Sequence, residues 1–285
     1  MFDSFLLESI INGLLLGGVL ALLALGLNLI FGVIDVVWIC YAELVMIGMY
    51  AIYWLYVFYG VPLPGAVIAA VLAVALLGVL LHRLVIEPVL GTAPINQLLV
   101  TGGVLFFLQA AATLAFGIEF RNLGIRMPLV EFGDMFFSFA RILAFITALV
   151  GVFLLWLFLT RTYLGTAIRA ISQDREIMPL MGVDPRRIYL ITSAIGGGMA
   201  GMAASLLVLQ YDVHPAIGLS FGPITFMVCV MGGLGNMLGG FVAAFIFAQF
   251  LSVGGYRFQI EWGYVIAFCF FIAMMFIRPK GLFSR

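Results

Sequence analysis

The stretch GAVIAAVLAVALLGVLL (residues 65–81) decides the fold class, because it contains no charged side chain. Uninterrupted apolar runs of about 18 residues are typical of helices that cross a bilayer. The rest of the chain has the same character, since 65% of its 285 residues are hydrophobic and 9% are charged. Soluble domains carry roughly 25% charged residues. We therefore predict an all-α, polytopic transmembrane helical bundle.

Apolar segments of this kind recur along the whole chain. They cover residues 8–31, 36–59, 62–82, 96–116, 138–160, 187–209, 216–231, 237–251 and 259–278. The seventh and eighth segments are short for a bilayer, which needs about 20 helical residues, and the glycine-rich stretch MGGLGNMLGG joins them. This pair can re-enter from one face instead of crossing, so we predict eight or nine spans.

The basic residues are distributed unequally between the two sets of loops. Nine of the 13 fall on one side, namely Arg83, five arginines within 161–187 and three basic residues near the C-terminus. Cytoplasmic loops of multi-pass proteins carry the excess of Lys and Arg. The pattern predicts that residues 161–187 and the C-terminus are cytoplasmic and that the N-terminus is outside.

Residues 161–187 are unlike the rest of the chain, because they hold eight of its 26 charged residues. Apolar side chains recur among the charges, so the segment is not a disordered linker: Ile171, Ile177, Leu180 and Met181. Ser172 or Asp174 can cap the N-terminus of a helix, and Gly182 can close its C-terminus. We predict a short amphipathic helix over residues 172–182 at the cytoplasmic surface.

Three roles are open for this helix on the residues alone. It can be a solvated loop that carries the cytoplasmic charge, or a helix that lies on anionic lipid, although Asp174 and Glu176 argue against lipid. It can also dock into a groove on a cytosolic partner. After it, Asp184 and Pro185 have the sequence of an N-cap and first helical residue of the next span.

Several motifs in order resemble one family. Arg-(x)3-Gly at 161–165, RAISQDRE (169–176) and Gly-Val-Asp at 182–184 are similar to the coupling loop of the branched-chain amino acid family of ABC importer permeases. Other stretches agree in order and spacing: NGLLLGGVLALLALGLNLIFGV (12–33), ITSAIGGGMAGMAASLL (191–207), VMGGLGNMLGG (230–240) and RPKGLF (278–283).

The resemblance implies a single transmembrane permease domain over residues 1–285, with a cytoplasmic coupling loop at 161–187. In that family the short helix of the loop fits a cleft on the ATPase subunit. The ATPase-coupling residues are then Ser172, Gln173, Asp174, Arg175, Glu176, Ile177, Leu180, Met181 and Gly182.

The resemblance also implies the partners and the location. These are a second homologous permease, two cytoplasmic ABC ATPase subunits, an extracytoplasmic solute-binding protein and membrane lipid, in the bacterial cytoplasmic (inner) membrane. No nucleic acid is expected as a partner. The family default is import of branched-chain or other amino acids; urea, amides and aromatic carboxylates stay open as related small solutes.

The chain itself is not expected to be an enzyme. A P-loop needs Gly-Lys-Ser/Thr to hold nucleotide phosphates, and the only lysine, Lys280, lies in RPKGLF. No His, Asp and Glu cluster has the spacing of a metal site, so no metal and no cofactor are predicted here. ATP and magnesium belong on the partner ATPases.

One motif departs from the family. Where its members carry an Asn-Phe-Ala-His-Gly-like run, this chain has WICYAE (38–43). Asp35 and Glu43 are acids in or beside the membrane, where an ionisable residue is a functional candidate. Trp38 and Tyr41 are three apart, which places them on one face of a helix. We predict that Trp38, Tyr41 and Glu43 line the translocation pathway.

The spacing of the glycines indicates helix packing. Small residues four apart let membrane helices approach closely, and three pairs have this spacing: Gly13 and Gly17, Gly197 and Gly201, Gly235 and Gly239.

The alternative to an ATP-driven importer is an ion- or proton-coupled secondary carrier or a channel, with Glu43 as the coupling acid.

Overall fold

The computed structural model describes residues 4–125, 127–132, 135–175, 177–257 and 259–283, and helices make up most of them. The elements are α1 (Ser4–Ile34), α2 (Tyr41–Val57), α3 (Leu63–Leu81), α4 (Glu87–Val89), α5 (Pro94–Phe116), β1 (Leu129–Phe132), β2 (Met135–Ser138), α6 (Phe139–Arg161), α7 (Tyr163–Gln173), α8 (Pro185–Leu207), α9 (Ile217–Gly232), α10 (Met237–Arg257) and α11 (Ile260–Ile277). A π-helical stretch, His82–Ile86, joins α3 to α4.

Each of the nine predicted apolar segments contains a helix, but they differ in length. Six helices in the described chain are long and apolar enough to cross a membrane: α1, α3 with its extension to Val89, α5, α6, α8 and α10. The helices α2, α9 and α11 are apolar but shorter. The predicted helical membrane bundle is therefore confirmed, whereas the count of eight or nine spans is not.

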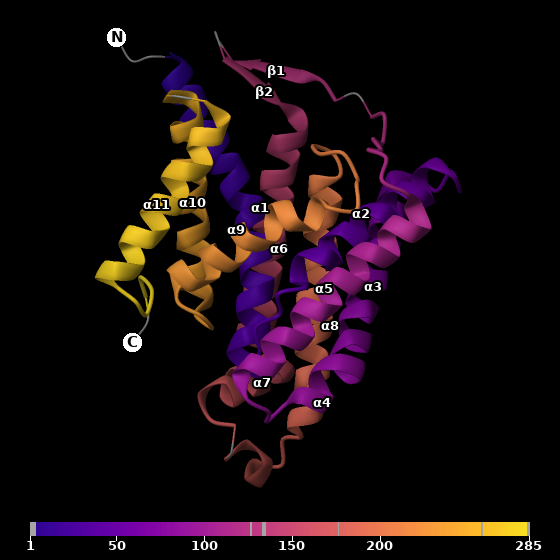
Figure 1. Cartoon of the computed structure of the whole chain (residues 1–285), viewed down its shortest axis with the longest axis vertical. Coiled ribbons are helices and arrows are strands. Elements are labelled where there is room, and N and C mark those ends of the chain that lie inside the picture. The colour runs from indigo at the N-terminus through magenta and orange to yellow at the C-terminus, as the bar shows by residue number, and fades with distance from the viewer. Residues whose placement is uncertain (1–3, 126, 133–134, 176, 258, 284–285) are drawn as a thin grey trace.

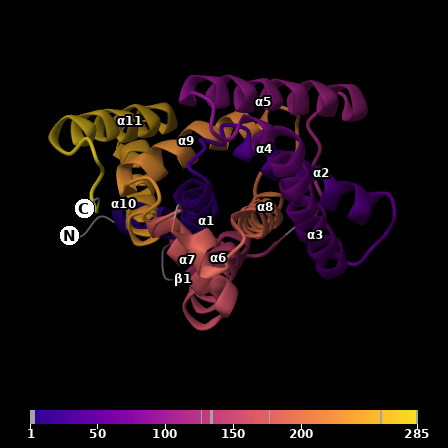
Figure 2. The same ribbon diagram turned by 90° about the horizontal axis from the view of Figure 1, so that it is seen from below.

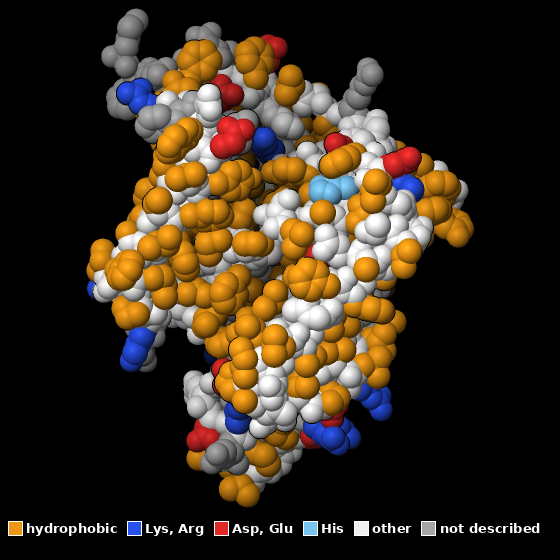
Figure 3. Space-filling model, viewed as in Figure 1, with side chains coloured by type: hydrophobic (Ala, Val, Ile, Leu, Met, Phe, Trp, Pro, Cys, Tyr) orange, Lys and Arg blue, Asp and Glu red, His pale blue; other side chains and the backbone are white. Residues whose placement is uncertain are grey.

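The bundle is built around α1. Figure 2 shows α5, α9 and α11 along one side, α6 and α7 on the opposite side, and α1, α8 and α10 between them. In its most apolar stretch, 83% of the residues of α1 are buried inside the protein. In Figure 3, apolar side chains cover the middle of one face and charged side chains gather toward its two ends, as in a protein whose middle lies in the apolar part of a bilayer.

Glycines set the close approaches of the long helices. A Cβ atom on Gly17 would lie 2.6 Å from the ring of Phe245 in α10, and one on Gly13 would lie 2.9 Å from Gln249. Gly197 and Gly201 face α3, where a Cβ atom would lie 2.7 Å from the Val74 carbonyl oxygen or 2.9 Å from the Val71 Cα. Small residues thus bring α1 onto α10 and α8 onto α3.

The α9–α10 hairpin differs from its prediction in two ways. α10 ends at Arg257 and is long enough to span, so only α9 is short. Gly235 lies in the turn at φ +80° and packs on Gly32 of α1, so it is not part of a helical pair with Gly239. Gly239 begins α10 against the backbone of Gly232. These glycines close a tight turn, which spacing alone cannot distinguish from a helix contact.

A small β-hairpin precedes α6 and was not predicted. β1 and β2 pair antiparallel, with Leu129 opposite Ser138, and they lie at the same end of the bundle as the N-terminus (Figure 1). An isolated bridge between Arg121 and Val213 ties this connection to the α8–α9 loop. The fold is all-α in its bundle, with this hairpin as an addition.

Candidate translocation site and coupling segment

The chain between α1 and α2 is not helical, and this break forms the wall of a cavity. Asp35 ends α1 at φ +62°, the one non-glycine residue with positive φ in the described part of the chain. α2 begins only at Tyr41. The prediction of one helix over 36–59 is therefore wrong at its start, and Trp38 and Tyr41 do not share a helix face. An Asp tolerates the left-handed conformation better than most residues.

The cavity has a volume of about 350 Å³ and lies between the break, α1, α5 and α9. Its walls are mostly apolar, and they come from Leu27, Val37, Trp38, Ile39, Tyr41, Ala42, Leu98, Leu105, Gly218, Leu219, Gly222, Pro223, Thr225 and Phe226. Thr101 of α5 holds the break in place by donating from Oγ1 to the Val37 carbonyl over 3.0 Å. Trp38 and Tyr41 thus meet at one cavity through the tertiary fold.

The Tyr41 side chain contacts two other helices, α8 and α1. Its hydroxyl donates to the Gly196 carbonyl of α8 over 3.1 Å and contacts Gly26 of α1. The side chain is 1% exposed. A larger residue than glycine at position 26 would collide with the hydroxyl. Tyr41 therefore fastens α2 to α1 and α8 beside the cavity.

Glu43 lies behind the cavity wall rather than on it. Its carboxylate is 0% exposed and contacts Gly218 of α9, where a Cβ atom would lie 2.6 Å from the carboxylate carbon. Neither carboxylate oxygen has a hydrogen-bond partner among the residues that the structure describes, and neither has the indole Nε1 of Trp38. Two polar groups, one in the cavity wall and one against Gly218 behind it, are thus buried without a hydrogen-bond partner in the described chain.

Residues 161–187, predicted to be the coupling loop and called the coupling segment below, are organised differently from their prediction. The α-helix here is α7, which starts after Thr162, whose hydroxyl accepts from the Gly165 amide over 3.0 Å. α7 ends at Gln173, and Ser172 lies inside its last turn, donating to the Arg169 carbonyl. The predicted helix over 172–182 is therefore wrong in its bounds, because Ser172 does not cap a helix start.

A second, shorter turn completes the segment. Residues Met178–Met181 form a 3-10 turn that Gly182 closes at φ +80°. The Asp174 carboxylate accepts from the Ile177 amide over 3.1 Å. Pro179, which has no amide hydrogen, suits a short turn better than a helix interior. Among the predicted coupling residues, Glu176 lies outside the described residues.

The coupling segment exposes a group of large apolar side chains. Ile177, Leu180 and Met181 are 53%, 85% and 74% exposed, and nothing lies within 4 Å of where a side chain on Gly182 would start. Gln173 also faces solvent. In Figure 1 the segment projects from the end of the bundle opposite the β-hairpin. Exposed apolar residues at the tip of a charged loop are typical of a docking surface.

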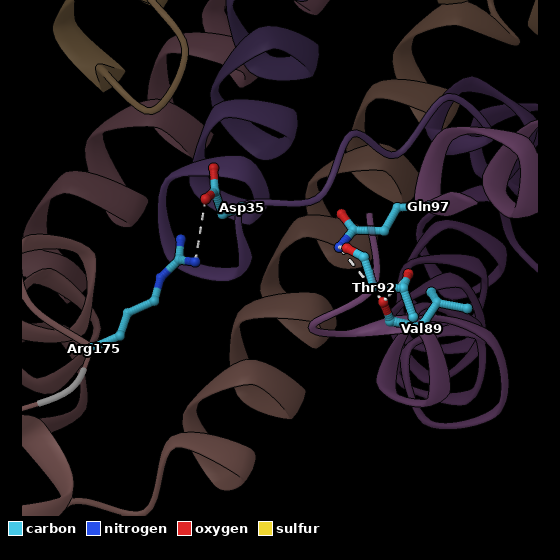
Figure 4. A network of polar contacts seen from close by, with 5 residues as sticks. All are labelled: Asp35, Val89, Thr92, Gln97 and Arg175. Carbon is cyan, nitrogen blue, oxygen red and sulfur yellow. Dashed lines mark hydrogen bonds and ion pairs between the residues drawn. The ribbon is translucent and has the colours of Figure 1, made fainter. Parts of the chain in front are cut away.

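Ion pairs tie the coupling segment to the bundle at two points. Arg175 reaches Asp35 at the end of α1 over 3.4 Å (Figure 4). Arg186, in the first turn of α8, pairs with Glu87 of α4 over 2.8 Å. As predicted, Asp184 caps α8, accepting from the Arg186 amide over 3.0 Å. The segment is therefore attached to α1 directly before the break that forms the cavity wall.

The connection between α4 and α5 is held by its own polar contacts. Gln97 donates to the Thr92 carbonyl over 3.1 Å, and the Thr92 hydroxyl donates to the Val89 carbonyl over 2.8 Å (Figure 4). This turn positions the start of α5, whose Leu98 lines the cavity.

The opposite end of the molecule carries an aromatic and basic cluster. The Arg121 guanidinium lies 5.7 Å and 5.9 Å from the ring centres of Tyr53 and Trp54. Beside it, His214 packs on Phe120 with ring centres 4.6 Å apart. Partial burial lowers the pKa of His214, against the opposing effect of Asp212. No group of three or more possible metal-ligating His, Cys, Asp or Glu side chains occurs in the described part of the chain.

Sequence reasoning missed the contribution of α9 to this site. Gly218 and Gly222 face Glu43 and Ala42, and they stand four residues apart, as in the other glycine pairs. That spacing was a usable signal. The role of Thr101 had none, because its bond to Val37 joins residues 64 positions apart.

Comparisons with known proteins give a consistent result. Residues 9–275 match the family described as branched-chain amino acid transport system / permease component. The chain is 29% identical over 294 residues to the high-affinity branched-chain amino acid transport system permease protein BraD of Pseudomonas aeruginosa, covering 98% of this chain and 96% of BraD. It is 26% identical to LivH of Escherichia coli K12, a permease protein of the same description, over 100% of this chain and 98% of LivH.

Two further matches are to a curated protein and to a solved structure. LivM of Escherichia coli K12, also named a permease protein of the high-affinity branched-chain amino acid transport system, is 26% identical over 92% of this chain and 67% of LivM. Among solved structures, a chain of PsaBC from Streptococcus pneumoniae in complex with Fab matches with a TM-score of 0.53 and 14% identity, covering 94% of this chain and 91% of that one. That likeness concerns the fold alone.

Proposed function

Since the chain belongs to the family of branched-chain amino acid transport system permease components, we propose that it is the transmembrane permease subunit of an ATP-driven ABC importer. Its substrates are branched-chain or other apolar amino acids delivered by a solute-binding protein. The observation that carries the proposal is the attachment of an exposed apolar coupling segment to α1 next to an intramembrane cavity. The family is one of transport permeases, and the chain is a multi-pass membrane protein.

The partners follow from this proposal. A second homologous permease is expected, since Escherichia coli K12 has both LivH and LivM named as permease proteins of one such system. Two ATPase subunits, which hold ATP and magnesium, dock on the coupling segment through Ile177, Leu180 and Met181. The solute-binding protein docks at the end that carries Arg121 and His214.

The coupling path is short. Closure of the ATPases moves residues 163–182, and the Arg175–Asp35 pair passes this motion to the end of α1. Asp35 is three residues before Trp38, so the break and the cavity wall move with it. The coupling roles of Ser172, Gln173, Asp174 and the other predicted residues are part of this proposal.

The proposal also includes the arrangement of the chain in the membrane. The chain is one permease domain over 1–285 in the bacterial inner membrane, with a cytoplasmic C-terminus, as the excess of basic residues around the coupling segment supports. With the six long helices, the three shorter helices α2, α9 and α11 make nine membrane-embedded segments, the larger of the two counts predicted.

The test is gentle purification of a tagged copy from its own host, with mass spectrometry of the proteins that accompany it. An ATPase with a P-loop and a second hydrophobic permease are expected. Deletion of that ATPase should abolish amino acid uptake. A homo-oligomer with no ATPase, whose uptake persists and follows a proton or ion gradient, would contradict the importer and favour a secondary carrier.

A further inference from the structure

We propose that the cavity between the α1–α2 break, α5 and α9 is an intramembrane binding site for one apolar, zwitterionic α-amino acid. In this site Glu43 receives the ammonium group when α9 moves away from α2. The inference rests on the proposed function and names how the substrate is held during import. It follows from three chemically different parts of the site.

The first part is the apolar wall. The cavity volume of about 350 Å³ lies within the range of about 300–1,000 Å³ that small-molecule sites occupy. Of its few polar side chains, the Thr225 hydroxyl already donates to the Phe221 carbonyl and the Tyr41 hydroxyl to that of Gly196. A sugar or a charged side chain would be buried here without partners, which is unfavourable. A hydrocarbon side chain fits.

The second part can receive a carboxylate. Trp38 lines the cavity, is 1% exposed, and its Nε1 has no hydrogen-bond partner among the described residues. Tyr41 and Ala42, the first residues of α2, lie in the same wall. The Tyr41 and Glu43 amides already donate to the Trp38 and Cys40 carbonyls, so the start of α2 contributes the partial positive charge of a helix N-terminus rather than free amide hydrogens. No Lys or Arg is among the described residues that line the cavity, so the neutral indole donor and the partial positive charge suit a single carboxylate.

The third part can receive a cation. The Glu43 carboxylate is fully buried and has no partner in the described chain, an unfavourable state unless a proton or a cationic group compensates it. Gly218, which contacts the carboxylate, also lines the cavity, and Gly222 lies beside Ala42 one turn further along α9. Because α2 and α9 meet here through small residues, a small displacement of α9 exposes the carboxylate to the cavity.

The experiment uses the whole importer complex in nanodiscs, without the solute-binding protein. Equilibrium binding of tritiated leucine is measured, with two competitors: 4-methylpentanoate, which lacks the ammonium group, and 3-methylbutylamine, which lacks the carboxylate. The variants are Glu43→Gln and Trp38→Phe. Trp54→Phe is the matched control, because its Nε1 is also unpartnered but it does not line the cavity. Assembly of each complex is verified by co-purification.

For the wild type, we expect unlabelled leucine to compete with tritiated leucine and neither analogue to do so. Glu43→Gln should weaken leucine binding about tenfold or more and remove the discrimination against 4-methylpentanoate. Trp38→Phe should weaken binding and remove the discrimination against 3-methylbutylamine, whereas Trp54→Phe should behave as the wild type.

The outcomes separate the two proposals. If the wild-type complex imports amino acids but binds no leucine, the site is wrong while the importer stands. The same holds if Glu43→Gln and Trp38→Phe bind as the wild type, or if Trp54→Phe loses binding equally. If the wild-type complex shows no ATP-dependent import of any amino acid when its binding protein is restored, the proposed function itself is wrong.

Discussion

Asp35 and Glu43 stand eight residues apart in the chain and occupy opposite environments. The side chain of Asp35 is 60% exposed and pairs with Arg175, whereas Glu43 is fully buried and has no hydrogen-bond partner in the described chain. An exposed ion pair contributes about 0–1 kcal/mol to stability, and an unpaired buried carboxylate lowers it. The Asp35–Arg175 ion pair is therefore suited to break and re-form during a transport cycle. The Glu43 carboxylate is suited to bind a cationic ligand.

The largest effect is expected where α9 closes over Glu43. Gly218→Leu would place side-chain atoms on the carboxylate, since even a Cβ atom lies 2.6 Å from it. Overpacking of this kind costs about 1–3 kcal/mol or more, so we expect loss of the monodisperse complex on size exclusion. Gly102→Leu on α5, with nothing within 4 Å, is the control. Equal yields for both variants would show that the α2–α9 contact is loose.

The next effect concerns the buried carboxylate itself. Glu43→Gln keeps the shape and removes the charge, so amino acid import should fall about tenfold or more. The thermal unfolding midpoint should not fall, because no ion pair or hydrogen bond of this carboxylate is lost within the described chain. Asp35→Asn, measured in parallel, should leave substrate affinity unchanged. A lower midpoint for Glu43→Gln would mean that the carboxylate is structural.

A several-fold effect on coupling is expected at the tip of the coupling segment. Gly182 has φ +80°, which costs a side-chain-bearing residue about 1–2 kcal/mol, so Gly182→Val should reshape the turn, leave folding intact and uncouple ATP hydrolysis from import. Reversing the charges of Asp174 and Glu176 together should also leave folding intact and uncouple ATP hydrolysis from import. The readout is import per ATP hydrolysed. Gly60→Val, at φ +65° with equally open space in the α2–α3 loop, is the control. Normal coupling in Gly182→Val would contradict the docking assignment.

The smallest effect is expected for the exposed ion pair. Asp35→Arg or Arg175→Asp should reduce import per ATP, because the link from the coupling segment to α1 becomes repulsive. Unfolding free energy should change by about 1 kcal/mol or less for Arg175→Asp, and by about 1–2 kcal/mol more for Asp35→Arg, because arginine adopts the left-handed conformation at φ +62° less readily than aspartate. The double exchange Asp35→Arg with Arg175→Asp restores attraction and should restore coupling. If the double variant is as poor as the single ones, the two residues act independently.

The sequence predicted the helices better than their ends. The interiors of all nine apolar segments are helical, and Asp184 caps α8, because hydrophobic runs and side-chain caps are local properties. The break before α2 was missed, since residues 36–40 are as apolar as a helix core. The coupling helix lies earlier than predicted, because Thr162 caps its start, Ser172 lies in its last turn, and Pro179 belongs to a separate short turn.

The sequence by itself determined an all-α membrane bundle, the family and a charged segment carrying apolar residues, because composition, run length and motif order do not depend on packing. Only the tertiary structure decided that Trp38 and Tyr41 meet α9 at one cavity, that Glu43 rests on Gly218, and that Arg175 reaches Asp35. These contacts join residues up to 175 positions apart. Their distances follow from how closely glycine-lined helices approach, which no local pattern of residues specifies.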